Sequence, residues 1–156
     1  KPILGKSDMP VTDYNSTSLT VSDMDRSIAW YRDNLGFEVL SDRIRDPEYC
    51  EALTGVDGAQ IRMVHLDGSG GRIELMQYIK GAGGEIDKAT NHVGAMQVGF
   101  MVDDAHKFYD ELVAKGIRMR SKHLVEITEG PNKGGAIFFA EDPDGIVVKF
   151  LHLPAG

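Results

Sequence analysis

The chain has 156 residues, of which 42% are hydrophobic and 26% charged, and its formal net charge is −7 at pH 7. This length suffices for one compact core, and the composition is that of an ordinary globular protein. The acidic balance argues against a nucleic-acid partner, because phosphate binding draws on clustered Lys and Arg. Cys50 is the only cysteine, which excludes an intrachain disulfide and a Cys-rich zinc site and favours a reducing, cytoplasmic location.

The sequence contains no apolar run near the roughly 18 residues that a membrane span needs. Its first residues also lack the apolar region of a signal peptide, so we expect neither a span nor a leader. Because the chain begins at Lys1, we expect further N-terminal residues in the natural protein.

Two segments about half a chain apart share one plan. They are "TVSDMDRSIAWYRDNLGFEV" (20–39) and "MVDDAHKFYDELVAKGIRM" (101–119). Each combines a β-prone lead, an acidic helix start, an apolar helix face and a glycine before the next strand. This repeat indicates that the chain consists of two similar modules.

The helices of the two segments have recognisable ends. In the first segment we predict a helix over 24–35, with Asp23 as its N-cap and Gly36 as its C-terminal stop. In the second, Asp103 or Asp104 caps the helix. The apolar residues of both recur at three- and four-residue spacing, which is typical of helices that lie on a sheet.

Three β-prone segments follow each helix, at 37–43, 59–66 and 72–79 in the first half and at 117–127, 135–141 and 146–152 in the second. Each half therefore has the order β-α-β-β-β. We predict a first module over 14–79, a glycine-rich polar linker over 80–95 and a second module over 96–154. A single module would leave one sheet face uncovered, so the two should pack together.

Four segments carry a resemblance to a known family: "LTVSDMDRSIAWYRDNLGF", "GFMVDDAHKFYDEL", "EGPNKGG" and "FFAEDPDGIVVKF". They resemble the vicinal oxygen chelate superfamily of glyoxalases, bleomycin-resistance proteins and extradiol dioxygenases, over nearly the whole chain. The resemblance implies an α+β fold of two tandem β-α-β-β-β modules, whose curved mixed sheets close around a cavity, and a homodimer. The superfamily hosts lyases, isomerases, dioxygenases and plain binders, so the fold alone does not define the activity.

In metal-using members of this superfamily, four inward His and Glu side chains hold the cation. The four positions fall here on Ser16, Glu74, Gln97 and Lys149, so only Glu74 keeps a strong ligand. A protonated lysine does not ligate a divalent cation, and hydroxyl and amide groups are weaker ligands than imidazole. We therefore expect no cofactor and no metal at these positions, with an ion pair between Glu74 and Lys149 instead. A displaced divalent metal site that joins Glu74 to a histidine is an alternative.

These positions lead to a hypothesis about function. We expect a metal-independent lyase or isomerase in which Glu74 and Lys149 act on a small oxygenated compound by acid-base chemistry. A deprotonated lysine would also form a Schiff base with a carbonyl. We do not expect lactoylglutathione lyase activity, because the resemblance implies a metal for it. The alternatives are a non-catalytic binder of the bleomycin-resistance type, a metal-dependent glyoxalase or dioxygenase relative, and a Lys149 that only reaches solvent.

The residues expected to contact the substrate are Ser16, Gln97, Arg62, Met76, Tyr78, Met101 and Lys133. Alternation along its strand would place Arg62 on the inner face with Glu74, although a one-residue shift in register reverses the faces. By the same alternation, His65 should point away from Glu74. Lys133 lies in a glycine-rich loop that has the character of a lid, and a solvated loop lysine is the alternative.

Overall fold

The computed structural model describes residues 8, 10–68 and 70–155. The first half contains β1 (Thr17–Thr20), α1 (Met24–Leu35), β2 (Glu38–Ile44), α2 (Pro47–Thr54), β3 (Gln60–Gly68) and β4 (Gly71–Lys80). The second half contains β5 (Gln97–Met101), α3 (Ala105–Ala114), β6 (Val125–Glu126), β7 (Ala136–Glu141) and β8 (Val147–His152). Within the described ranges, no helix has the length and apolar character needed to cross a membrane.

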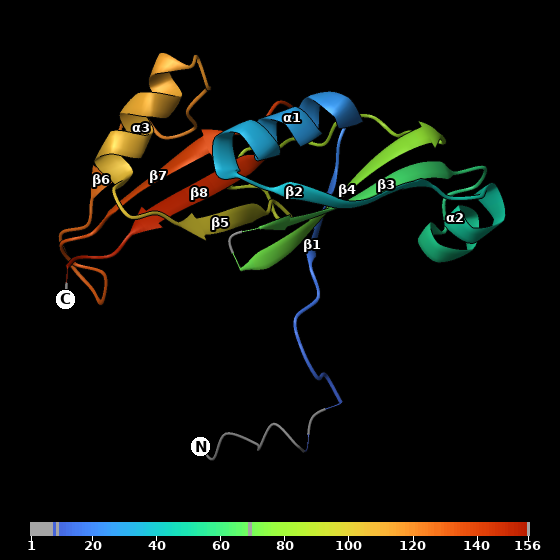
Figure 1. The fold of residues 1–156 in the computed structure, drawn as a ribbon, viewed down its shortest axis with the longest axis horizontal. Coiled ribbons are helices and arrows are strands. Elements are labelled where there is room, and N and C mark those ends of the chain that lie inside the picture. The colour runs from blue at the N-terminus through green and yellow to red at the C-terminus, as the bar shows by residue number, and fades with distance from the viewer. Residues whose placement is uncertain (1–7, 9, 69, 156) are drawn as a thin grey trace.

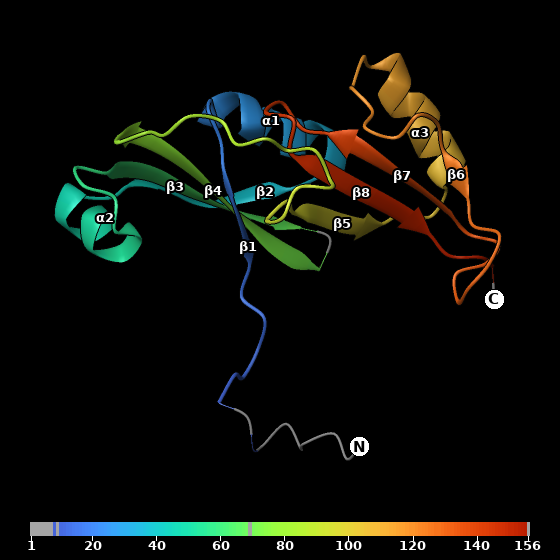
Figure 2. The same ribbon diagram turned by 180° about the vertical axis from the view of Figure 1, so that it is seen from behind.

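Each half forms one four-stranded mixed sheet. The strand orders are β1-β4-β3-β2 and β5-β8-β7-β6. In both sheets the first strand of the module runs parallel to its last strand, and the other neighbours are antiparallel. Figures 1 and 2 show α1 and α3 on the same side of the two sheets. The predicted α+β class with two β-α-β-β-β modules is confirmed.

The helix α1 begins and ends where its sequence predicts. The side chain of Asp23 accepts a hydrogen bond from the backbone N–H of Arg26, and Gly36 adopts the left-handed conformation at φ 75° that ends the helix. Met24 and Tyr31 on its buried side enter the first core with the inner residues of β1, β3 and β4. This packing leaves the opposite face of the first sheet free of α1.

The helix α3 has the corresponding place on the second sheet. Asp104, and not Asp103, is the N-cap, because its carboxylate accepts from the N–H of Lys107. Ala105 and Leu112 pack against Phe138 and other core residues of β7 and β8. Both helices therefore cover the same side of the molecule.

Two elements differ from the prediction. The segment "DPEYCEALTG" forms α2, whose signals were a capping Asp46, a proline at the first turn and Gly55 at the end. The predicted strand over 117–127 shrinks to two residues. Met119 makes only an isolated bridge, and the Ser121 hydroxyl accepts the N–H of Phe139, so a side chain replaces a backbone partner and interrupts the strand.

Candidate functional site

The face of the two sheets opposite α1 and α3, here termed the open face, carries Glu74 and Lys149. Leu75 belongs to the first core, so the preceding Glu74 on β4 points to the open face. Phe150 belongs to the second core, so Lys149 on β8 points to the open face of the second sheet. Both side chains are partly exposed. The two residues therefore lie on the same side of the molecule.

The other two positions of the family quartet offer weak ligands. Ser16 lies directly before β1, and its hydroxyl donates to Asn15 at 2.9 Å. Gln97 opens β5 and is exposed. Glu74 supplies the only carboxylate, and hydrogen bonds occupy both of its oxygens. On this donor chemistry, the four residues do not fit the divalent cation that the family pattern implies.

Lys149 occupies space that Gly99 provides. The two residues are register partners on neighbouring strands. A Cβ added at Gly99 would lie 2.7 Å from the Cε of Lys149, closer than a methyl group can approach. The lysine stem therefore runs across β5, whose Val98 and Phe100 pack against the first core. Gly99 thus leaves room for the lysine stem, although neither strand pattern nor family resemblance pointed to it.

Glu74 forms its contacts within the first sheet. Its Oε1 accepts from the Ser18 hydroxyl at 3.1 Å, and its Oε2 lies 2.6 Å from His65 Nε2. The other ring nitrogen of His65, Nδ1, is 2.8 Å from the Ser41 hydroxyl. One hydrogen-bonded chain, termed the relay (Ser18, Glu74, His65, Ser41), therefore crosses β1, β4, β3 and β2. Among the described residues no ion pair joins Glu74 to Lys149, so the predicted pair is not formed.

The prediction that His65 points away from Glu74 is wrong. Gly68 pairs with Gly71, and in the register that this pair begins His65 falls directly opposite Glu74. The sequence contains a signal for this register. If Gly68 and Gly71 form the first pair of the hairpin, counting three residues back from Gly68 and three forward from Gly71 pairs His65 with Glu74. Alternation along one strand does not set the register to its neighbour, so it does not determine which residue lies opposite Glu74.

Arg62 consequently lies on the helix side, and the expectation that it shares the face of Glu74 is wrong. It donates two hydrogen bonds to Asp42, at 2.9 and 2.7 Å, and one to Asp25 of α1 at 2.9 Å. The hydrogen bonds to Asp42 are the main reason why the pKa of Arg62 is raised. The same bonds lower the pKa of Asp42. Arg62 thus ties β2 and β3 to α1.

The remaining predicted contacts spread over the open face and its rim. Met76 and Tyr78 lie on the open face of β4, where they pack with the cluster that contains Cys50 of α2. Met101 ends β5 and is 59% exposed. Lys133 lies in an exposed turn before β7. The two sheets therefore bring these apolar side chains onto the face of Glu74 and Lys149, while Lys133 stays in a loop.

A second group of polar residues lies at the start of α3. Asp104, His106 and His152 each offer a ligand atom, and these atoms all lie within 4.8 Å of one another. The Nδ1 of His152 accepts the N–H of Ala105 at 2.9 Å, and His106 bonds to Glu126. The bond to Glu126 raises the pKa of His106. The three ligand atoms are close enough for a divalent cation to bind between them.

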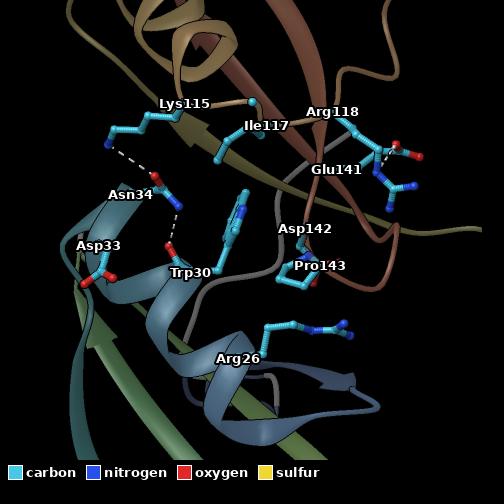
Figure 3. Close-up of a pocket in the computed structure, with 11 residues that line it drawn as sticks. Arg26, Trp30, Asp33, Asn34, Lys115, Ile117, Arg118, Glu141, Asp142 and Pro143 are labelled. Atoms are coloured by element: carbon cyan, nitrogen blue, oxygen red, sulfur yellow. Dashed lines mark hydrogen bonds and ion pairs between the residues drawn. The ribbon is translucent and has the colours of Figure 1, made fainter.

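A groove of about 560 Å³ lies on the helix side, away from the open face. It runs between α1 and the segment after α3, around Trp30 (Figure 3). Its polar groups are engaged with one another: Lys115 donates to Asn34 at 3.2 Å, and Arg118 pairs with Glu141 at 3.6 Å. Charges paired within the wall do not converge on a common point, so this groove is a weaker candidate than the open face.

Comparisons with known proteins identify the family. A family model described as "Glyoxalase/Bleomycin resistance protein/Dioxygenase superfamily" matches residues 13–150. A protein of Haemophilus influenzae named lactoylglutathione lyase is 33% identical over 139 residues, which cover 87% of this chain and 89% of that protein. A probable lactoylglutathione lyase of Vibrio parahaemolyticus is 28% identical over 140 residues, with 87% of both chains covered.

The fold of a solved relative agrees with this match. A glyoxalase family protein from Bacillus cereus has a TM-score of 0.79 at 16% identity, over 96% of this chain and 99% of that chain. Identity this low supports the fold alone, whereas the family model spans most of the sequence. The chain therefore belongs to the Glyoxalase/Bleomycin resistance protein/Dioxygenase superfamily.

Proposed function

We propose that this chain is a lyase or isomerase that acts on a small oxygenated compound at the open face, with Glu74 and Lys149 as its acid-base groups. Relatives named lactoylglutathione lyase, similar over most of their length, support the class of enzyme. The reaction proceeds without a metal at the four family positions. A small-molecule substrate, a homodimer and a cytoplasmic location are parts of the same proposal.

One observation carries this proposal: the space for Lys149 is built into the neighbouring strand at Gly99. The absence of a side chain at Gly99 lets the end of the lysine stem lie against β5. Among the described residues Lys149 has no ion-pair partner, so its amine is available to a substrate oxygen. An ammonium at that point stabilises the negative charge that develops on an enolate or alkoxide oxygen, and it can supply the proton.

Glu74 is the proposed base, which complements Lys149 as the acid. Its carboxylate is held by Ser18 and His65 and is 20% exposed, so it accepts a proton while its orientation stays constant. Glu74 would take a proton from a substrate carbon next to a carbonyl group, while Lys149 donates a hydrogen bond to the carbonyl oxygen. Gln97, Ser16 and Met101 would orient the substrate, with Met76 and Tyr78 on the apolar side and Lys133 on the loop.

The experiment measures the exchange of a carbon-bound hydrogen of the substrate for deuterium from the solvent. We would incubate the protein in D₂O with small 2-oxo acids, aldehydes and glutathione hemithioacetals, and follow deuterium incorporation by proton NMR. Lys149→Met should lower the exchange rate by about 10² to 10⁴-fold, the contribution of a positioned acid-base group. The matched control is Lys107→Met, an exposed lysine of α3 that pairs with Glu111 and should leave the rate unchanged.

Two outcomes would reject the proposal. A compound that binds tightly to both wild type and Lys149→Met without any exchange would indicate a binding protein of the bleomycin-resistance type. A rate that disappears with a chelator and returns with Zn²⁺, Ni²⁺ or Mn²⁺ would indicate a metal-dependent enzyme. Sedimentation velocity on the same samples would test the homodimer.

A further inference from the structure

We infer that the first sheet carries a second activity, the hydrolysis of activated esters or thioesters, with Ser41 as nucleophile, His65 as general base and Glu74 as the orienting acid. The inference goes beyond the proposed function, because it uses a nucleophile on β2 and a different reaction. It shares Glu74, and the His65 that holds Glu74, with the acid-base site.

The hydrogen bonds of the relay determine where its protons lie. An ionised carboxylate only accepts, so Glu74 Oε2 accepts from Nε2–H of His65 over 2.6 Å. In the neutral ring with its proton on Nε2, the Nδ1 of His65 carries a lone pair and accepts from the Ser41 hydroxyl, 2.8 Å away. The order nucleophile, base and acid is the one that activates a serine in hydrolases of unrelated folds, but the two ring nitrogens are exchanged, because in those hydrolases Nε2 faces the serine and Nδ1 the acid.

The relay is open to a substrate. The side chain of His65 is 35% exposed and that of Glu74 20%, so neither is sealed in the core. Ser41 is half-buried on β2, an edge strand, and a register shift interrupts the pairing between Val39 and Ser41. Such bulges redirect a side chain out of the sheet and are frequent next to active sites.

A cation lies close to the serine on the same strand. Arg43 is two residues beyond Ser41, and its partner Met63 faces the same side as His65, so Arg43 shares the open face. Its side chain is exposed, and no ion pair engages it within the described part of the chain. The guanidinium can therefore donate to the oxygen of a tetrahedral intermediate.

The reaction balances with water as the only co-reactant. The Ser41 oxygen bonds to the ester carbonyl carbon while its proton passes to His65 Nδ1, and the intermediate expels an alcohol or thiol that takes this proton. Water then attacks the acyl-serine, giving its proton to Nδ1, and the acid is released as the Ser41 hydroxyl is restored. Glu74 holds the imidazolium that forms in each half of the reaction.

The test uses two probes on the whole chain: 4-nitrophenyl acetate for turnover and a fluorophosphonate for covalent labelling. The label should be found on the peptide that contains Ser41, and labelling should fall in His65→Gln. Ser41→Ala should lower ester hydrolysis by about 10²-fold or more, and Ser41→Cys should restore acylation, because the thiol is also a nucleophile.

A matched control is Ser22→Ala, since the Ser22 hydroxyl donates to a carboxylate, that of Asp144, and not to an imidazole. Circular dichroism of each variant would show that the fold is kept. A label on another residue, or equal hydrolysis by wild type and Ser41→Ala, would overturn the inference. Because deuterium exchange and ester hydrolysis use separate substrates, this result is distinguishable from failure of the lyase or isomerase proposal.

Discussion

At the scale of the residue, the least conspicuous position in the site is Gly99. It lies beneath the stem of Lys149, and the absence of a side chain allows the lysine to cross β5. Gly99→Ala keeps every charge but brings a methyl group within 2.7 Å of Cε, so the flexible stem must move. If the amine acts on the substrate, we expect a loss of about 10²-fold in turnover, as for a 1 Å misplacement of a reacting group.

The measurement is the D₂O exchange rate of Gly99→Ala beside that of Gly83→Ala. Gly83 has open space where a Cβ would be, so its substitution tests the general effect of replacing a glycine. Equal rates in Gly99→Ala and wild type would mean that the position of the lysine amine does not limit the reaction.

The pH at which His106 loses its proton should depend on its partner Glu126. The hydrogen bond to Glu126 raises the pKa of His106, with smaller contributions from Asp104 and Asp110, while the His152 ring lies 5.5 Å away. Because the folded pKa is raised, the stabilisation by this pair is fully present below the unfolded value of about 6.5 and is lost as pH rises through the folded pKa.

An NMR titration of the histidine ring protons would measure this shift. In the wild type His106 should titrate above pH 6.5, and in Glu126→Gln its midpoint should move down, because the charged partner is removed. The same midpoint in both proteins would show that the bond to Glu126 is not populated in solution.

At the scale of the element, the turn before β8 is attached to α1. Asp142 is buried, and it accepts from the Tyr31 hydroxyl at 3.0 Å and from the N–H groups of Asp144 and Ile146. Burial raises the pKa of Asp142 in spite of these donors. In the same turn, Asp144 accepts from Ser22 and Arg26. The turn that leads to Lys149 is therefore held in place by the other module.

Tyr31→Phe should destabilise the fold by about 1 to 3 kcal/mol, because a buried carboxyl group loses one of its donors. Urea denaturation would measure the loss in free energy of unfolding. The control is Tyr109→Phe, a partly buried tyrosine of α3 that contacts Phe138 and whose hydroxyl has no hydrogen bond within the described residues. Similar stabilities for the two variants would contradict the role assigned to the Tyr31 hydroxyl.

At the scale of the whole molecule, the two modules share their packing. Trp30, Leu35 and Phe100 are packed against the cores of both sheets. A ring contact at 5.6 Å between Phe37 and Phe100 joins β5 to the first module. Side chains that belong to both cores cannot be released by the unfolding of one module alone.

We therefore expect one cooperative unfolding transition. Trp30 is the only tryptophan and lies between the two cores, so its fluorescence reports their contact. Far-UV circular dichroism reports the helices and sheets of both modules. The two signals should give the same midpoint in urea. A fluorescence transition that precedes the loss of secondary structure would indicate modules that separate before they unfold.

Local patterns were sufficient for most of the fold. The caps at Asp23 and Gly36, the helix periodicity and the repeated β-α-β-β-β order depend on neighbouring residues, so they were predictable. The ends of α2 carry signals of the same local kind, at Asp46 and Gly55. The strand over 117–127 could not be foreseen as broken, because the bond between Ser121 and Phe139 depends on a distant strand.

The sequence by itself determined the two modules and the family, and it predicted weak metal ligands at Ser16, Gln97 and Lys149. Only the tertiary structure decided what surrounds the two remaining charged groups. Register brings His65 to Glu74 and Gly99 under Lys149, and it sends Arg62 to the other face. The physical reason is that strand pairing joins residues far apart in the chain, and a one-residue shift in register reverses every face.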